Sequence, residues 1–68
     1  MNKDWIKIYS TGIDYKAELL KGLLLEHDIE AVILNKKDSS YGFGELELYV
    51  SSDDVIKANH IITTQDQL

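Results

Sequence analysis

The sequence contains no cysteine, so a disulfide, a thiolate zinc site and a cysteine nucleophile are all excluded for this chain. The chain also has only 68 residues. A domain of about 60 residues buries roughly 60% of the surface that its unfolded chain exposes, so its core is thin. Because no crosslink supports that core, we expect self-association to contribute to its stability.

Arginine is absent as well. All seven basic residues are lysines, and 12 acidic residues outnumber them to give a net charge of -5. The planar guanidinium group is the common means of gripping phosphate or guanine with two hydrogen bonds. An acidic chain without it lacks the positive surface that drives binding to nucleic acids or to anionic membranes, so we expect neither partner.

Long hydrophobic runs are also missing. No segment approaches the roughly 20 apolar residues of a membrane-spanning helix, and the N-terminal residues lack the hydrophobic stretch of a signal peptide. A content of 44% hydrophobic and 28% charged residues is typical of a folded globular protein. We therefore expect a cytoplasmic protein with one domain over residues 1–68, folded over about 4–62 with a C-terminal tail at 63–68.

What the sequence does have is clear periodicity. Alternation of apolar and polar residues predicts strands over residues 5–9 and 45–50. Residues 29–35 are apolar at odd and even positions alike, which is typical of a strand that is covered on both faces or forms an interface. Apolar residues at helical spacing predict helices over residues 14–27 and 55–62.

The helix ends carry their own signals. Thr11 or Asp14 is predicted to cap the first helix, and Ser51 or Ser52 the second, because each offers a side-chain oxygen to free backbone N–H groups. Gly22 lies inside the first helix, where it costs roughly 1 kcal/mol. We expect close packing of this helix on the sheet to account for that glycine.

The order strand, helix, strand, strand, helix predicts an α+β fold with one layer of strands and one of helices. A right-handed crossover makes the first two strands parallel, and a hairpin loop at residues 36–44 leads into the last strand. Placing that strand between the other two gives an antiparallel sheet in the order 1-3-2 with both helices on one face. This βαββα arrangement is a ferredoxin-like fold without its usual fourth strand.

The residues of these elements resemble a known family. The matching segments are Ser10-Thr11, residues 17–24, Ile29-Glu30-Ala31, residues 45–50, and Asp54 with Ala58. Over about residues 6–62 the chain is similar to a bacterial family described as putative prokaryotic signal-transducing proteins. The resemblance implies a fold similar to the nitrogen-regulatory PII (GlnB-type) proteins, within the ferredoxin-like group, and a signalling role.

Two positions depart from the pattern of that family. Its members commonly end the first helix with glycine, whereas this chain has Asp28. Asp28 is therefore predicted to take the left-handed backbone conformation that glycine adopts without strain. The hairpin loop contains no arginine and no glycine-rich phosphate cradle, so we do not expect an ATP-type ligand.

Catalytic and metal-binding patterns are not apparent. His27 and His60 are the only histidines, and neither has the ligand spacing of a metal site. We therefore expect neither a metal nor another cofactor. The serines of loops and helix starts have no identifiable base beside them, and we interpret them as turn and cap residues rather than nucleophiles. These are Ser39, Ser40, Ser51 and Ser52.

The sheet face away from the helices is the candidate interface. Its predicted apolar residues are Trp5, Tyr9, Val32, Leu34 and Tyr49. A large apolar patch on so small a protein usually marks an interaction site, and the unpaired edge of the first strand adds free backbone groups to it. The plainer alternative is that a cross-strand ion pair covers this face.

The hairpin loop is a second candidate site. Its candidate binding residues are Lys36, Lys37, Tyr41 and Phe43. A plain flexible hairpin whose Phe43 packs into the core explains the loop equally well.

Taken together, the sequence favours a regulatory binding module without catalytic activity. It binds a protein partner, a second copy of itself as in a homodimer, or a small-molecule effector through the open sheet face. The alternative is a self-associating structural or accessory subunit without a ligand. An enzyme with a site between subunits is a third hypothesis, and it requires a polar cleft with perturbed ionisable groups.

Overall fold

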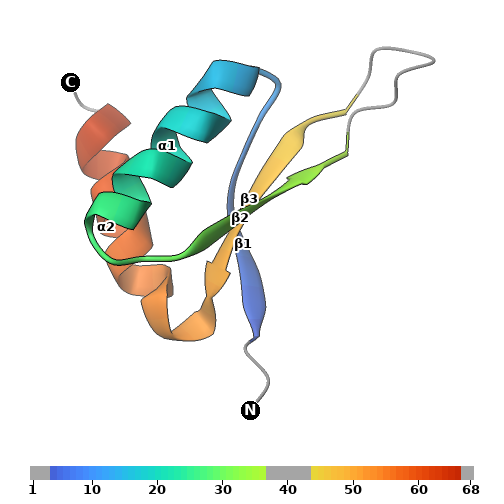
Figure 1. Ribbon diagram of the computed structural model, residues 1–68. Helices are drawn as coiled ribbons and strands as arrows, with labels where there is room; N and C mark the ends of the chain where they lie inside the picture. Colours follow the sequence, from blue (N-terminus) through green and yellow to red (C-terminus); the bar gives the residue numbers. More distant parts are fainter. Residues whose placement is uncertain (1–3, 37–43, 67–68) are drawn as a thin grey trace.

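The computed structural model describes residues 4–36 and 44–66, which form one sheet of three strands and a layer of helices (Figure 1). In chain order the elements are β1 (Trp5–Thr11), α1 (Asp14–Glu26), β2 (Ala31–Asn35), β3 (Leu46–Ser51), the short 3-10 helix η1 (Ser52–Asp54) and α2 (Val55–Asp66). The predicted order of elements is confirmed.

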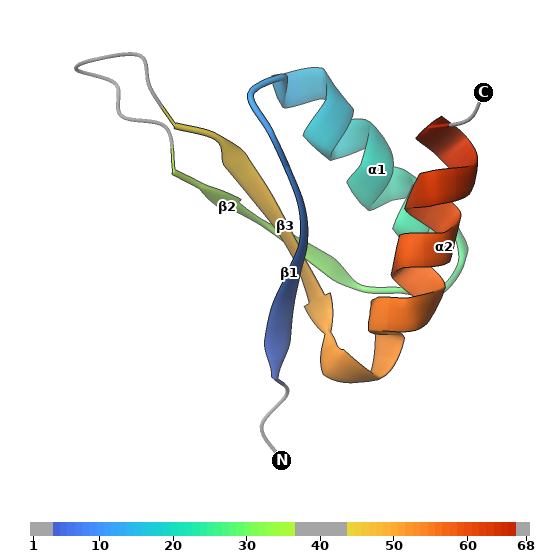
Figure 2. The same cartoon turned by 180° about the vertical axis from the view of Figure 1, so that it is seen from behind.

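The sheet has the predicted topology. Its strand order is β1-β3-β2, and the central strand β3 is antiparallel to both neighbours. Both helices lie on the same side of the sheet, as the two opposite views show (Figures 1 and 2). α1 packs on all three strands, and α2 packs on β1 and β3. The α+β, ferredoxin-like βαββα arrangement is therefore confirmed.

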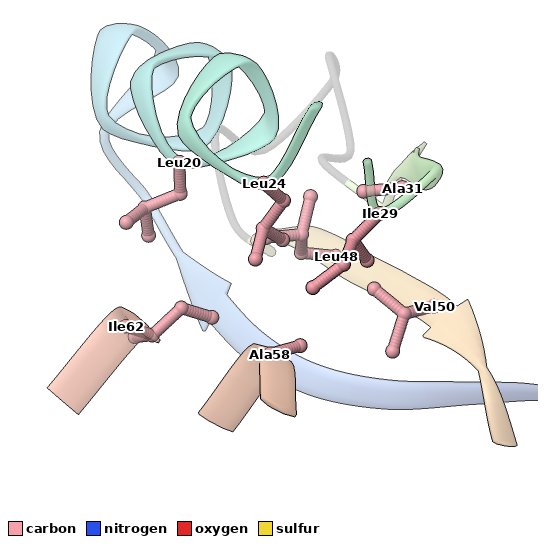
Figure 3. Packing of buried hydrophobic residues seen from close by; sticks show 8 residues of the cluster. All are labelled: Leu20, Leu24, Ile29, Ala31, Leu48, Val50, Ala58 and Ile62. Atoms are coloured by element: carbon pink, nitrogen blue, oxygen red, sulfur yellow. The ribbon is translucent and has the colours of Figure 1, made fainter. Parts of the chain in front are cut away.

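Alternation along β3 decides which side chains enter the core. Leu46, Leu48 and Val50 are buried beneath the helices, whereas Glu47 and Tyr49 are half-buried on the other face. The core cluster joins residues from both layers (Figure 3). Its members are Leu20, Leu24, Ile29, Ala31, Leu48, Val50, Ala58 and Ile62.

A β-bulge at Ile8 changes the alternation of β1. Lys7 lies opposite Tyr49, but Tyr9 lies opposite Leu48, so Ile8 is an extra residue in the strand. Tyr9 is thereby moved to the helix side, where it packs with Ile8 against the core. The prediction that Tyr9 lies on the open face is wrong, because one inserted residue reverses the faces of all positions beyond it.

The ends of two elements also differ from the predictions. β1 continues through Thr11 rather than stopping at Tyr9, since its residues stay paired with β3 up to Leu46. α2 continues to Asp66, so residues expected in the tail are helical. Neither α1 nor α2, the helices of the described part of the chain, is long and apolar enough to cross a membrane.

The end of α1 confirms the prediction for Asp28. Its φ is 62°, and it is the one non-glycine residue with positive φ in the described part of the chain. The Asp28 N–H donates to the Leu25 carbonyl and the Ile29 N–H donates to the Leu24 carbonyl, at 2.9 Å each. These bonds form a Schellman motif, which satisfies free carbonyls and places Ile29 beside Leu24 in the core.

The helix starts are only partly as predicted. Ser51 caps η1, because its hydroxyl accepts the Asp53 N–H at 3.3 Å. Ile13 occupies the N-cap of α1 without a side-chain cap, and Thr11 Oγ1 instead accepts the Ile13 N–H at 3.1 Å. A Cβ atom at Gly22 would meet nothing within 4 Å. The prediction that close packing explains Gly22 is therefore wrong, since this position faces outward.

Candidate binding face

The open face of the sheet contains a shallow apolar hollow. Its volume is about 350 Å³, and its lining consists of Trp5, Val32, Leu34 and Tyr49. Each of the three strands contributes at least one of these side chains. Four of the five predicted interface residues are thus brought together, and the fifth, Tyr9, lies on the other side of the sheet.

Strand register explains why these side chains gather. Val32 lies directly opposite Tyr49, so the two share one face of the antiparallel pair. Leu34 lies on the same face, two residues further along β2. Trp5 lies on β1, the other neighbour of β3, at a position before the bulge. Trp5 is 40% exposed, and Val32 and Leu34 are each 43% exposed. Large apolar side chains therefore face solvent together rather than singly.

Polar groups on this face bond to one another. Lys7 Nζ lies 3.6 Å from Glu47 Oε2, and the Tyr49 hydroxyl donates to Glu47 Oε1 at 2.8 Å. The hydrogen bond from Tyr49, reinforced by Lys7, lowers the pKa of Glu47 below its usual 4.5. The same bond raises the pKa of Tyr49 above its usual 10.0. The hydroxyl and the carboxylate thus fix the Tyr49 ring at the rim of the hollow.

The expected ion pair exists but does not cover the apolar residues. Lys7 and Glu47 form it across β1 and β3, yet neither residue lines the hollow. The hydroxyl of Tyr49 is already engaged with Glu47. What remains facing the hollow is almost wholly apolar, so this surface is suited to accept an apolar group rather than a charged one.

Tyr9 has a different environment from the one predicted. Its ring lies under Lys16 of α1, with Nζ 5.6 Å from the ring centroid, which is within the range of a cation–π interaction. Tyr9 therefore helps to join β1 to the helix layer.

The second candidate site is largely outside the described residues. Lys37, Tyr41 and Phe43 of the hairpin loop lie there. Lys36 is described, and its N–H donates to the Glu45 carbonyl at 3.0 Å, which continues the pairing of β2 with β3. Its side chain is exposed.

The two histidines approach each other in the fold, which their separation in sequence did not indicate. His27 and His60 line one groove of about 260 Å³ between α1 and α2, together with Leu23 and Ile61. Within the described residues, no cluster of three or more potential ligands could hold a metal ion.

A larger groove runs along the outer edge of the sheet, and the sequence analysis missed it. Its volume is about 810 Å³, and α1 and β2 form its walls. On the helix side it is lined by Asp14, Glu18, Lys21 and Leu25. Leu25 is apolar yet exposed in the structure, and no pattern in the sequence set it apart from the apolar residues of α1 that enter the core.

Comparison with known proteins identifies a family but no individual relative. A family model described as "Putative prokaryotic signal transducing protein" matches residues 5–65. Searches of curated proteins and of solved structures gave no significant match.

Proposed function

Because the chain belongs to the family of putative prokaryotic signal transducing proteins, we propose that it is a non-catalytic signalling module whose open sheet face binds a partner protein. The occupant of the hollow is an apolar side chain of that partner. The observation that carries this proposal is the gathering of Trp5, Val32, Leu34 and Tyr49, from all three strands, around one hollow.

The composition of the hollow favours a protein partner. Tryptophan and tyrosine supply large contact areas at a low cost in side-chain entropy, and they are enriched at the centres of protein interfaces. The ion pair of Lys7 with Glu47 lies beside the apolar residues, where it forms part of a polar rim. An apolar centre with a polar rim is the usual anatomy of a protein–protein interface.

A nucleotide or another polar metabolite fits this face less well. Such ligands need hydrogen-bonding groups that converge on them, and phosphates need backbone N–H groups or cations. The hydroxyl of Tyr49, which lies at the hollow, donates to Glu47. The Glu47 carboxylate, which accepts that bond, would repel a phosphate.

Trp5 provides the reporter for a test, because it is the single tryptophan of the chain and lines the hollow. Peptides are selected for binding from a displayed random library and then titrated against the wild-type protein while Trp5 fluorescence is followed. We expect the selected peptides to share an apolar anchor residue. We expect them also to shift the Trp5 emission to shorter wavelength as the indole ring leaves water.

A matched pair of variants locates the binding surface. Tyr49→Ala removes one wall of the hollow and retains the reporter, and it should weaken peptide binding at least about tenfold. Tyr15→Ala makes the same change at an exposed residue of α1 and should leave affinity unchanged. Equal binding to Tyr49→Ala and wild type would refute the proposal. So would a response of Trp5 to nucleotides, amino acids or keto acids without any response to peptides.

A further inference from the structure

The two edges of the sheet differ in how they are protected against pairing with another strand. β1 carries the charged Lys7 and a bulge at Ile8, and both features discourage the addition of a strand. β2 has the sequence Ala-Val-Ile-Leu-Asn, without a charge, and its register with β3 is unbroken. Within residues 4–36 and 44–66 no strand pairs with its outer side. β2 is therefore the unprotected edge.

The backbone direction of β2 follows from one hydrogen bond. The Lys36 N–H donates to the Glu45 carbonyl, so the backbone groups of Lys36 point toward β3. Successive residues of an antiparallel strand alternate between pointing at the neighbour and pointing away. Val32 and Leu34 therefore point their backbone groups at β3. Ala31 and Ile33 point theirs outward, at the open edge.

The space next to this edge is large enough for another strand. The groove between α1 and β2 has a volume of about 810 Å³ and includes Ala31, Val32 and Ile33 in its lining. A strand added here bonds to the outward groups of β2 and places alternate side chains on either face of the sheet. On the helix side those side chains meet Leu25, which is exposed in the single chain.

We propose that the occupant of this groove is β2 of a second copy of the chain. The two β2 strands pair in antiparallel fashion about a two-fold axis at Ile33, and the two sheets become one. Ile33 lies opposite Ile33 of the second copy, and Ala31 lies opposite Asn35. This register brings the outward-pointing residues of both strands together, as an isologous interface requires.

The charges of α1 fit this arrangement. Glu18 and Lys21 both line the groove and lie nearly one helical turn apart. The two-fold axis makes the α1 helices of the two copies antiparallel, so the order of the charges is reversed between them. Lys21 of each copy is thereby directed toward the acidic end of α1, with Asp14 and Glu18, in the other. Asp14 and Glu30 also line the groove and make it acidic overall, so it disfavours an unrelated acidic strand. β2 of a second copy carries no charge into it, and the register about the two-fold axis sets Glu30 of each copy opposite Lys36 of the other.

The dimer also enlarges the open face. Val32 and Leu34 of the two copies become neighbours across the axis, and the two hollows lie on the same side of the merged sheet. The inference does not rest on the proposed partner binding. The two are separable by mutation, because Tyr49 lies on the central strand, where it pairs with Val32 of its own chain, and it is not part of the outer edge of β2 that would pair with a second copy.

Sedimentation velocity over a wide range of protein concentrations tests the dimer, with Ile33→Lys and Ile8→Lys as a matched pair. Both isoleucines are half-buried and pack against the core, but they lie on opposite edges of the sheet. The wild type and Ile8→Lys should form dimers. Ile33→Lys should remain a monomer, because it places two like charges at the axis. Tyr49→Ala should still dimerise.

Hydrogen exchange of the wild type supplies a second measurement that requires no variant to fold. The amides of Ala31 and Ile33 should exchange more slowly as protein concentration rises. Those of Val32 and Leu34, which already bond to β3, serve as the internal reference. A monomeric wild type at all concentrations, a dimer of Ile33→Lys as tight as that of the wild type, or concentration-independent exchange at Ala31 and Ile33 would each overturn the proposal.

Discussion

The two faces of the sheet are built from alternate residues of the same strands, yet one face is buried beneath the helices and the other is exposed to solvent. On β3, Leu48 is 1% exposed beneath the helices, whereas its neighbour Tyr49 lies on the open side. On β2, Ala31 is buried, whereas Val32 is 43% exposed. Apolar character alone therefore does not decide burial in this protein. The position of the single helix layer decides it.

The difference in burial between the two faces of the sheet has a functional consequence. The apolar residues of the helix-covered face stabilise the fold, because they pack with residues of α1 and α2 in the core cluster. The open face keeps Val32 and Leu34 at a distance from that core, although a strand in a monomeric protein would normally carry polar residues at these positions. The apolar residues of the open face are thus available for binding, and those of the covered face are not.

A leucine-to-alanine substitution should have the largest effect on stability in the core and a much smaller one on the open face. Leu20→Ala and Leu48→Ala should each cost about 2–5 kcal/mol, because both side chains are fully buried. That cost approaches the whole stability expected of a small domain, so these variants are expected to fold poorly. Leu34→Ala should cost about 1 kcal/mol or less, since its side chain is 43% exposed.

Urea denaturation at one low protein concentration, where monomers predominate, measures all three leucine variants. A cooperative, near-wild-type transition for Leu48→Ala would mean that this side chain does not hold the helices to the sheet. A loss for Leu34→Ala as large as that for Leu20→Ala would mean that the two faces are not distinct in energy.

A change on the outside of the helix layer should raise stability. Gly22→Ala replaces an exposed helical glycine, and the added Cβ meets no atom within 4 Å. The gain should be about 1 kcal/mol, which corresponds to roughly 4–8 °C in melting temperature for a domain of this size. Thermal unfolding followed by circular dichroism measures it. An unchanged or lower melting temperature would show that Gly22 has a structural role.

A substitution at Asp28, in the turn that joins α1 to β2, should give a smaller gain in stability. Asp28→Gly should stabilise the fold by about 0.5–1 kcal/mol, because glycine adopts a φ of 62° without strain. Asp28→Ala is the control, since alanine is strained at this φ and should give no such gain. Chemical denaturation compares the midpoints. If Asp28→Gly had the lower midpoint, the aspartate side chain would be contributing more than the backbone strain removes.

The smallest expected effect on stability comes from the hydrogen bond between Tyr49 and Glu47 on the open face. Since the pKa of Glu47 is lowered in the folded state, its bond with Tyr49 contributes stability at neutral pH. That contribution is lost as the pH falls below 4.5, the usual pKa of the carboxyl group, and through the lowered value. The difference in unfolding free energy between wild type and Glu47→Gln should therefore shrink on acidification.

Glu45→Gln is the matched control for this pH dependence, because it removes a nearby carboxylate without affecting the bond between Tyr49 and Glu47. Urea denaturation of both variants and of the wild type at a series of pH values provides the comparison. A difference for Glu47→Gln that stays constant across the acidic range would contradict the assigned role of its carboxylate.

Local patterns along the chain determined much of this structure. The alternation over β3 predicted which of its residues enter the core, and that prediction is confirmed. The left-handed end of α1 at Asp28 was predicted from the resemblance to the family, whose members commonly have glycine at this place between the helix and the next strand, and it is confirmed. The two-sided apolar segment that contains Val32 and Leu34 pointed to the open face. The signals of β3 and of this segment depend on near neighbours in the sequence, so both are readable without the fold.

Only the tertiary structure decided the rest. Tyr9 follows the same alternation as Trp5 in the sequence, but the bulge at Ile8, which appears only when β1 pairs with β3, sends it to the helix side. The groove of about 810 Å³ joins Lys21 of α1 to Ile33 of β2, residues that no local pattern brings together. Register and edge exposure arise from pairing between distant segments, and the sequence contains no local signal for them.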